Sequence, residues 1–326
     1  MTNTTSIITI SYAELESNDE SVLTRIAQGF GNNDTSLGIL AITDVPKFEE
    51  LRSKVLRLTY QLGSETPKEV LEKLEDEKSY YSVGWSHGKE RVEGDKFDTG
   101  KGSFYFNPIT DHPLEDTLTR DFAIHDDDAD DEKKEEFIRL AEKNGAFYAS
   151  NIWPEETLPE LKENVMEMGL LIRRIGTLVA KQCDDYVLSQ CKEFTPGKIE
   201  HVIENSLCCK ARLLHYFPVD SPTIADSGSS SKAGNESETE DVDFSGWCGW
   251  HNDHGSLTGL VPAIYFNAQG EPVPCPDPKA GLYIKSRNGQ LVHAKIPTDA
   301  LAFQIGGEFV YILIFDYSSF PSHERC

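Results

Sequence analysis

The chain has 326 residues, of which 38% are hydrophobic, and its formal net charge is -24. This composition supports a sizeable core, and the strong negative charge disfavours both a nucleic-acid groove and an anionic membrane surface. No apolar run approaches the roughly 18 residues of a membrane span, and the start of the chain lacks a secretory signal pattern. The seven cysteines follow no disulfide framework, so we expect reduced thiols in a cytoplasmic protein.

Predicted helices dominate the first two-thirds of the chain. β-branched and apolar runs predict strands at 6–12 and 37–46. Apolar residues at helical spacing predict several helices. These helices span residues 14–30, 47–62, 66–74 and 159–188. Between them, residues 80–108 lack a helical period and predict loops with short strands.

Two strongly polar segments interrupt this pattern. Residues 126–136 form an acidic charge run, which predicts a solvated helix start or loop rather than a calcium loop, because the spacing of an EF-hand is missing. Residues 220–243 are rich in Ser, Glu and Asp and carry almost no large apolar side chain. Such a segment has little surface to bury, so we expect a disordered loop.

Short apolar stretches separated by turn residues fill the last third of the chain. They predict strands that form an antiparallel sandwich or barrel. Their ranges are 210–218, 257–266, 281–285, 290–296 and 300–305. Helices followed by strands define an α+β class.

The stretch GWCGWHNDHGSLTGL, residues 246–260, carries the clearest chemistry. If this stretch is a strand, His251 and Asp253 project from one face, because side chains two apart point the same way. With one further His they would complete a 2-His-1-carboxylate set for non-haem Fe(II). A lone H-x-D also fits a surface His hydrogen-bonded to an Asp. A zinc hydrolase using His254 as well is disfavoured, because adjacent strand residues face opposite ways; His254 is assigned a structural role.

The segment WHNDHGSLTGL resembles the H-x-D-x-G-x-L-T segment of the 2-oxoglutarate- and Fe(II)-dependent dioxygenases, in the plant and fungal group related to isopenicillin N synthase. Further segments resemble the family in the same order along the chain. They are SIITISYAEL, LGILAITDVP, YSVGWSHGKER, GSFYFNP, NIWPEETLPELKENV, ARLLHYFP and AGLYIKSRNGQLVHAKIPTDALAFQIGGE. The resemblance implies a double-stranded β-helix, or jelly roll, with helices packed outside.

The same resemblance implies the chemistry. His251 and Asp253 would bind Fe(II), with 2-oxoglutarate as co-substrate and ascorbate as an optional addition. A monomer would hydroxylate or desaturate a small organic substrate and release succinate and CO2. His215 and Phe217 fall where the family often contacts the co-substrate, although either residue also fits a core position.

The resemblance fails near the C-terminus. His323 lies near where a distal His ligand would fall, but no later Arg is available to pair the 5-carboxylate of 2-oxoglutarate, since Arg325 is too close. Either His323 is the third ligand of a short, divergent enzyme, or the resemblance ends near Gly306 and an unrelated tail replaces the last core strands. We favour the second alternative, in which translation continues into an unspliced intron and produces the unrelated tail. A catalytically impaired truncated isoform, or a non-catalytic jelly-roll binding protein, is the resulting alternative function.

The expected organisation follows from these patterns. We expect four consecutive segments. The first is an N-terminal helix and strand region, the second is an acidic segment with long helices, the third is a jelly-roll metal region that contains the 220–243 loop, and the fourth is an atypical apolar tail. Their ranges are 1–120, 121–200, 201–308 and 309–326.

Overall fold

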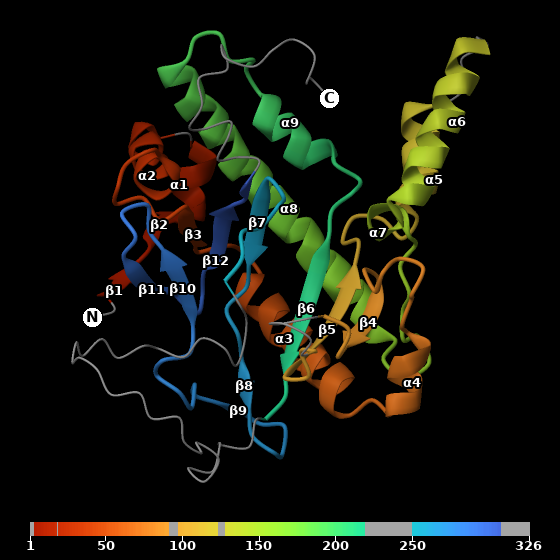
Figure 1. Ribbon diagram of the computed structural model, residues 1–326. Helices are drawn as coiled ribbons and strands as arrows, with labels where there is room; N and C mark the ends of the chain where they lie inside the picture. The colour runs from red at the N-terminus through yellow and green to blue at the C-terminus, as the bar shows by residue number, and fades with distance from the viewer. Residues whose placement is uncertain (1–2, 18, 91–96, 123–127, 219–249, 308–326) are drawn as a thin grey trace, which may run out of the picture.

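The computed structural model has a mixed helix and sheet architecture (Figure 1). It describes residues 3–17, 19–90, 97–122, 128–218 and 250–307. The expected 220–243 loop and the tail with His323 lie outside these residues. The described residues have the predicted mixture of helices and strands, and helices precede most of the strands.

The predicted strand at 6–12 is in fact two strands that belong to different sheets. β1 (Asn3–Ser6) pairs in parallel with β11 (Leu291–Lys295), whereas β2 (Ile8–Ser11) pairs in parallel with β3 (Ile39–Thr43). Ile7, which is buried, lies at the change of sheet. One short apolar stretch therefore ties two sheets together, which alternation along the sequence does not reveal.

The predicted helix at 14–30 is also divided. α1 (Tyr12–Ser17) precedes α2 (Glu20–Phe30), and the Asp19 carboxylate accepts a hydrogen bond from the backbone N–H of Ser21 at 2.7 Å. An Asp at this position satisfies an N–H that has no partner within the helix, so α2 begins as a new helix at this cap.

The later helices in this half follow the predictions closely. α3 (Phe48–Ser64) and α4 (Lys68–Lys73) match the expected 47–62 and 66–74. β4 (Gly84–His87) and β5 (Lys101–Phe106) are the short strands expected within 80–108. The main helix, α8 (Glu160–Gln190), has 31 residues and confirms the longest predicted pattern.

Several helices were not predicted. They are α5 (Pro113–Asp121), α7 (Gly145–Tyr148) and α9 (Lys198–Asn205). The acidic run lies largely within α6 (Asp128–Lys143), which Figure 1 shows at one side of the molecule. The start of α9 depends on α8, because the Asp184 carboxylate accepts hydrogen bonds from the backbone N–H groups of Ile199 and Glu200 at 3.0 and 2.9 Å.

The described strands form four separate sheets and no closed barrel. Their orders are β1-β11-β10, β2-β3-β12-β7, β4-β5-β6 and β8-β9. The strands of the last third are β6 (Ala211–Tyr216), β7 (Leu257–Leu260), β8 (Tyr265–Phe266), β9 (Pro272–Val273), β10 (Leu282–Lys285), β11 and β12 (Leu301–Ile305). The predicted strand positions are thus confirmed, with 257–266 split between β7 and β8.

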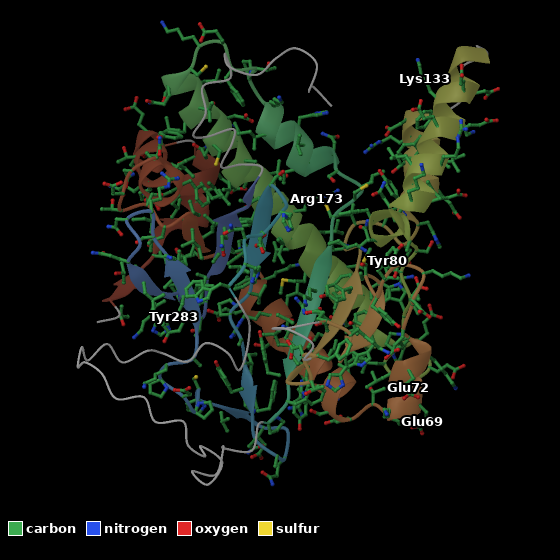
Figure 2. All side chains as sticks on the ribbon, in the orientation of Figure 1. Glu69, Glu72, Tyr80, Lys133, Arg173 and Tyr283 are labelled. Carbon is green, nitrogen blue, oxygen red and sulfur yellow. The ribbon has the colours of Figure 1, made fainter. Side chains whose placement is uncertain are left out.

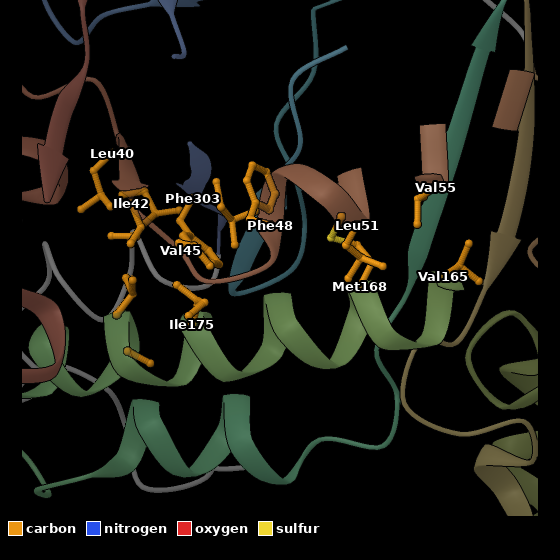
Figure 3. Packing of buried hydrophobic residues seen from close by; sticks show 14 of the residues in the cluster. Leu40, Ile42, Val45, Phe48, Leu51, Val55, Val165, Met168, Ile175 and Phe303 are labelled. Atoms are coloured by element: carbon orange, nitrogen blue, oxygen red, sulfur yellow. The ribbon is translucent and has the colours of Figure 1, made fainter. Parts of the chain in front are cut away.

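The core lies between α8 and the sheet that contains β12. Figure 3 shows Ile175 and Met168 of α8 facing side chains from β3, β12 and α3. Phe303, 1% exposed, lies in β12, which pairs with both β3 and β7. The β7 strand, which follows His251 and Asp253 in the chain, is therefore attached directly to the main core.

None of the helices in the described part of the chain combines the length and the apolar character needed to cross a bilayer.

Candidate functional site

His251 and Asp253 lie close together, but not on a strand as the sequence predicted. Residues 251–254 have irregular backbone, and β7 begins only at Leu257. The His251 Nε2 and Asp253 Oδ1 atoms are 3.5 Å apart, and their side chains are 62% and 28% exposed. The pairing of the two groups is therefore achieved by a bend ahead of the sheet, and not by strand alternation.

The Asp253 carboxylate is oriented by the strand that follows it. The Thr258 hydroxyl, on β7, donates a hydrogen bond to Asp253 Oδ2 at 2.6 Å. This bond leaves Oδ1 as the carboxylate oxygen that faces His251. Thr258 pairs with Gln304 of β12, so the orientation of the carboxylate is linked to the core sheet.

The backbone of the same bend is held by the end of β12. The Gly307 N–H donates to the Asp253 carbonyl at 2.8 Å, and the Gly306 N–H donates to the Ser256 carbonyl at 3.0 Å. A side chain at Gly306 would place its Cβ 1.8 Å from the Gly255 carbonyl oxygen. Glycine is therefore required at 306 for the two segments to approach, and this explains a glycine in the IGGE sequence.

The pair has suitable donor chemistry for a divalent metal. A nitrogen and an oxygen bound to one ion at about 2.1 Å each lie about 3 to 3.5 Å apart when the angle at the metal is about 90° to 110°. The observed 3.5 Å falls at the end of that range. An imidazole and a carboxylate at this separation fit two positions of a 2-His-1-carboxylate site.

Within the described residues, the structure brings no third protein donor to this pair. No three side chains of His, Cys, Asp or Glu in that part of the chain are grouped so that they could hold a metal ion. The three-residue zinc site with His254 is therefore not formed, and the His254 side chain is exposed. His323, the expected distal ligand, lies outside the described residues.

His215 lies on β6, Phe217 follows the end of that strand, and the His215 ring contacts α3. The Nε2 atom of His215 is 3.1 Å from the Ser64 hydroxyl, and its ring packs edge-on against Phe217 at 4.8 Å. Burial lowers the pKa of His215, and the neighbouring His87 lowers it further. A side chain at Gly63 would meet the His215 ring at 2.4 Å, so α3 and β6 are in close contact here.

The sequence did not predict an ionic network on β5, on the face of that strand that points away from His215. Lys101, 8% exposed, forms an ion pair with Asp98 at 2.5 Å, and Arg212 of β6 pairs with Glu90 at 2.8 Å. The Tyr105 hydroxyl donates to Glu90, and burial followed by this bond raises the Tyr105 pKa. The sequence signal for this network was alternation along β5. Lys101 and Tyr105 point to one face and Phe104 and Phe106 to the other, so the strand has one polar face.

The fold is similar to solved oxygenase structures at low sequence identity. A 2OG-Fe(II) oxygenase family protein from Caulobacter crescentus is 17% identical with a TM-score of 0.58, covering 94% of this chain and 77% of that chain. A C-terminally truncated protein from Neurospora crassa, solved in its apo form, is 16% identical with a TM-score of 0.53, covering 93% and 82%. JOX2, solved with 2OG, Fe and JA, is 13% identical with a TM-score of 0.52, covering 95% and 67%.

The fold is thus that of the 2OG-Fe(II) oxygenases, as these likenesses show. No protein-family model and no curated protein sequence matches the chain. The likeness therefore concerns the fold, and the activity of this chain has to be argued from its own residues.

Proposed function

We propose that this protein is an Fe(II)- and 2-oxoglutarate-dependent oxygenase acting on a small organic substrate. The single observation that carries the proposal is the His251–Asp253 pair, 3.5 Å apart and held against β7 and β12. The oxygenase fold supports it, as does the full-length form of the Neurospora crassa neighbour, which was solved in complex with alpha-KG and thymine.

His251 and Asp253 would supply two of the protein ligands, with His323 as the candidate third. Bound Fe(II) and 2-oxoglutarate would supply the oxidising chemistry, with succinate and CO2 as products and hydroxylation or desaturation as the outcome. Thr258 would hold the Asp253 carboxylate in its orientation, so that less reorganisation is needed when the metal binds. A jelly-roll core of the isopenicillin N synthase type is the finer form of this proposal.

Metal binding tests the ligand assignment. Mn(II) is titrated without oxygen into wild type and into the alanine variants of His251, Asp253 and His323. We expect the first two substitutions to abolish tight binding, because each removes a donor. His254→Ala is the matched control, since it removes an exposed imidazole three residues from His251. If His254→Ala weakens binding as much as His251→Ala, the assignment is wrong.

Succinate release tests the activity separately. Purified protein is incubated with 2-oxoglutarate, Fe(II), ascorbate and oxygen, and succinate is quantified. Iron-dependent succinate that disappears in Asp253→Ala supports the proposal. In the same assay, a raised KM for 2-oxoglutarate in His215→Ala or Phe217→Ala would support their expected co-substrate contacts, whereas lost stability with an unchanged KM would favour core packing.

A non-catalytic binding protein is the second candidate. The observation that favours it is that the described residues bring only two protein donors together at the bend. The same experiments separate the two functions. Binding of Mn(II) or 2-oxoglutarate without any succinate release supports a binding protein, and iron-dependent turnover eliminates it.

A further inference from the structure

Two consecutive cysteines, Cys208 and Cys209, lie in the connection between α9 and β6. Neither thiol is in a disulfide, and both residues are half-buried. The backbone from 206 to 210 is irregular, with α9 ending at Asn205 and β6 starting at Ala211. Within it, the Asn107 side-chain amide donates a hydrogen bond to the Leu207 carbonyl at 2.6 Å.

The Cys208 thiol has a polar and cationic environment. It is hydrogen-bonded with the Tyr148 hydroxyl, and it interacts electrostatically with the Arg120 guanidinium and the Lys210 ammonium group. Burial lowers the pKa of Lys210 to about 8, and the Lys210 Nζ donates to the Ser82 carbonyl at 2.8 Å. The Arg120 guanidinium also binds both oxygens of the Asp121 carboxylate, at 2.6 and 2.8 Å, so the thiol lies in a polar site of mixed charge.

The Cys209 thiol has a different environment. Its Sγ atom donates a hydrogen bond to the Ser206 carbonyl at 3.6 Å, and burial raises its pKa. The charge of Arg173 on α8, labelled in Figure 2, lowers the pKa of Cys209. Cys209 thus has its own hydrogen-bond partner, and it is covalently fixed next to Cys208.

We propose that Cys208 and Cys209 form a peroxide-sensitive dithiol that closes to a disulfide between neighbouring residues. The Cys208 sulfur attacks hydrogen peroxide, the O–O bond breaks, and a sulfenic acid and water result. The Cys209 sulfur then attacks the Cys208 sulfur, the S–O bond breaks, and a second water leaves with the Cys209 proton. The two sulfurs together lose two electrons and the peroxide is reduced.

The bond is expected to be readily reversible. Adjacent Cα atoms across a trans peptide are about 3.8 Å apart, below the usual range of about 4.4 to 6.8 Å for disulfide-bonded cysteines. A bond formed outside that range is strained, and strained disulfides are more easily reduced. A mild dithiol reductant should therefore restore the two thiols.

Other cysteines provide internal controls. Cys183 is fully buried on α8 and burial raises its pKa, so peroxide should not reach it. Cys191 and Cys275 are more accessible, but neither has a cysteine next to it in the sequence. These residues separate the effect of simple exposure from the effect of having an adjacent thiol.

Peptide mapping tests the proposal directly. Cleavage after Lys198 and Lys210 releases residues 199–210, which contain both cysteines and no others. Full-length protein is treated with hydrogen peroxide, and remaining thiols are then alkylated before digestion. We expect this peptide to become unalkylated and about 2 Da lighter than the reduced peptide, and to return to the reduced mass with dithiothreitol. Retention of two alkylatable thiols, or irreversible sulfinic acid at both, would overturn the proposal.

Serine variants test the order of the steps. In Cys209→Ser the sulfenic acid on Cys208 has no partner, so we expect strong labelling by dimedone, with little labelling in wild type. In Cys208→Ser we expect little labelling at Cys209. Equal labelling of wild type and Cys209→Ser shows that no dithiol closes. The wild-type peptide result decides the proposal independently if a variant folds poorly.

Discussion

Replacing Thr258 by Val should weaken metal binding without removing a ligand. The Thr258 hydroxyl donates to Asp253 Oδ2 at 2.6 Å, and valine keeps the branched shape on β7 while removing the donor. The carboxylate would then be free to rotate away from the position in which Oδ1 faces His251. Thr258→Ser is the matched variant, because it keeps the hydroxyl.

The size of the effect follows from the strength and burial of this bond. A hydrogen bond to a charged group contributes about 1.5 to 3 kcal/mol, and partial exposure favours the lower end. The Asp253 side chain is 28% exposed, so we take the lower figure. About 1.5 kcal/mol corresponds to roughly a tenfold change in affinity, which is the low end of the about 10- to 100-fold effects of groups that orient metal ligands.

Anaerobic calorimetric titration with Mn(II) measures this effect. We expect about tenfold weaker binding in Thr258→Val, near wild-type binding in Thr258→Ser, and no measurable binding in Asp253→Ala. Thr59→Val controls for a general effect of losing a hydroxyl, since the Thr59 hydroxyl donates within α3, to the Val55 carbonyl. The reasoning is refuted if Thr258→Val binds within twofold of wild type while Asp253→Ala has lost binding.

Other substitutions probe the fold around the site. Gly102→Ala should destabilise by about 1 to 3 kcal/mol, measured by urea unfolding, because its Cβ would lie 2.3 Å from the Trp85 ring; an unchanged midpoint would contradict this. Phe303→Ala should cost about 3 to 5 kcal/mol because it empties a buried position, and a loss under 1 kcal/mol would show that the core collapses to fill it. His215 has a lowered pKa in the folded protein, so the unfolded chain binds its proton first as pH falls below about 6.5. Wild type should therefore lose more stability than His215→Asn between pH 7 and pH 5, and equal losses would refute this.

Sequence patterns were enough to predict an element where its own apolar residues define the face that it buries. α3 and α8 were predicted because their apolar residues recur at helical spacing and bury one face against the core. The same holds for most strands of the last third, where turn residues bound short apolar runs. His251 and Asp253 were predicted from residue type and spacing to lie together as metal ligands; the structure places their side chains 3.5 Å apart, and their role as ligands stays a prediction.

Tertiary structure decided the features whose partners are distant in the chain. The sequence alone does not show that the Asp184 carboxylate caps α9, or that Ile7 marks a change of sheet, because both depend on contacts made only after folding. The strand expected at His251 does not form; hydrogen bonds from Gly306 and Gly307 fix the bend instead. Residue spacing determined which groups approach one another, and long-range backbone pairing determined the geometry in which they meet.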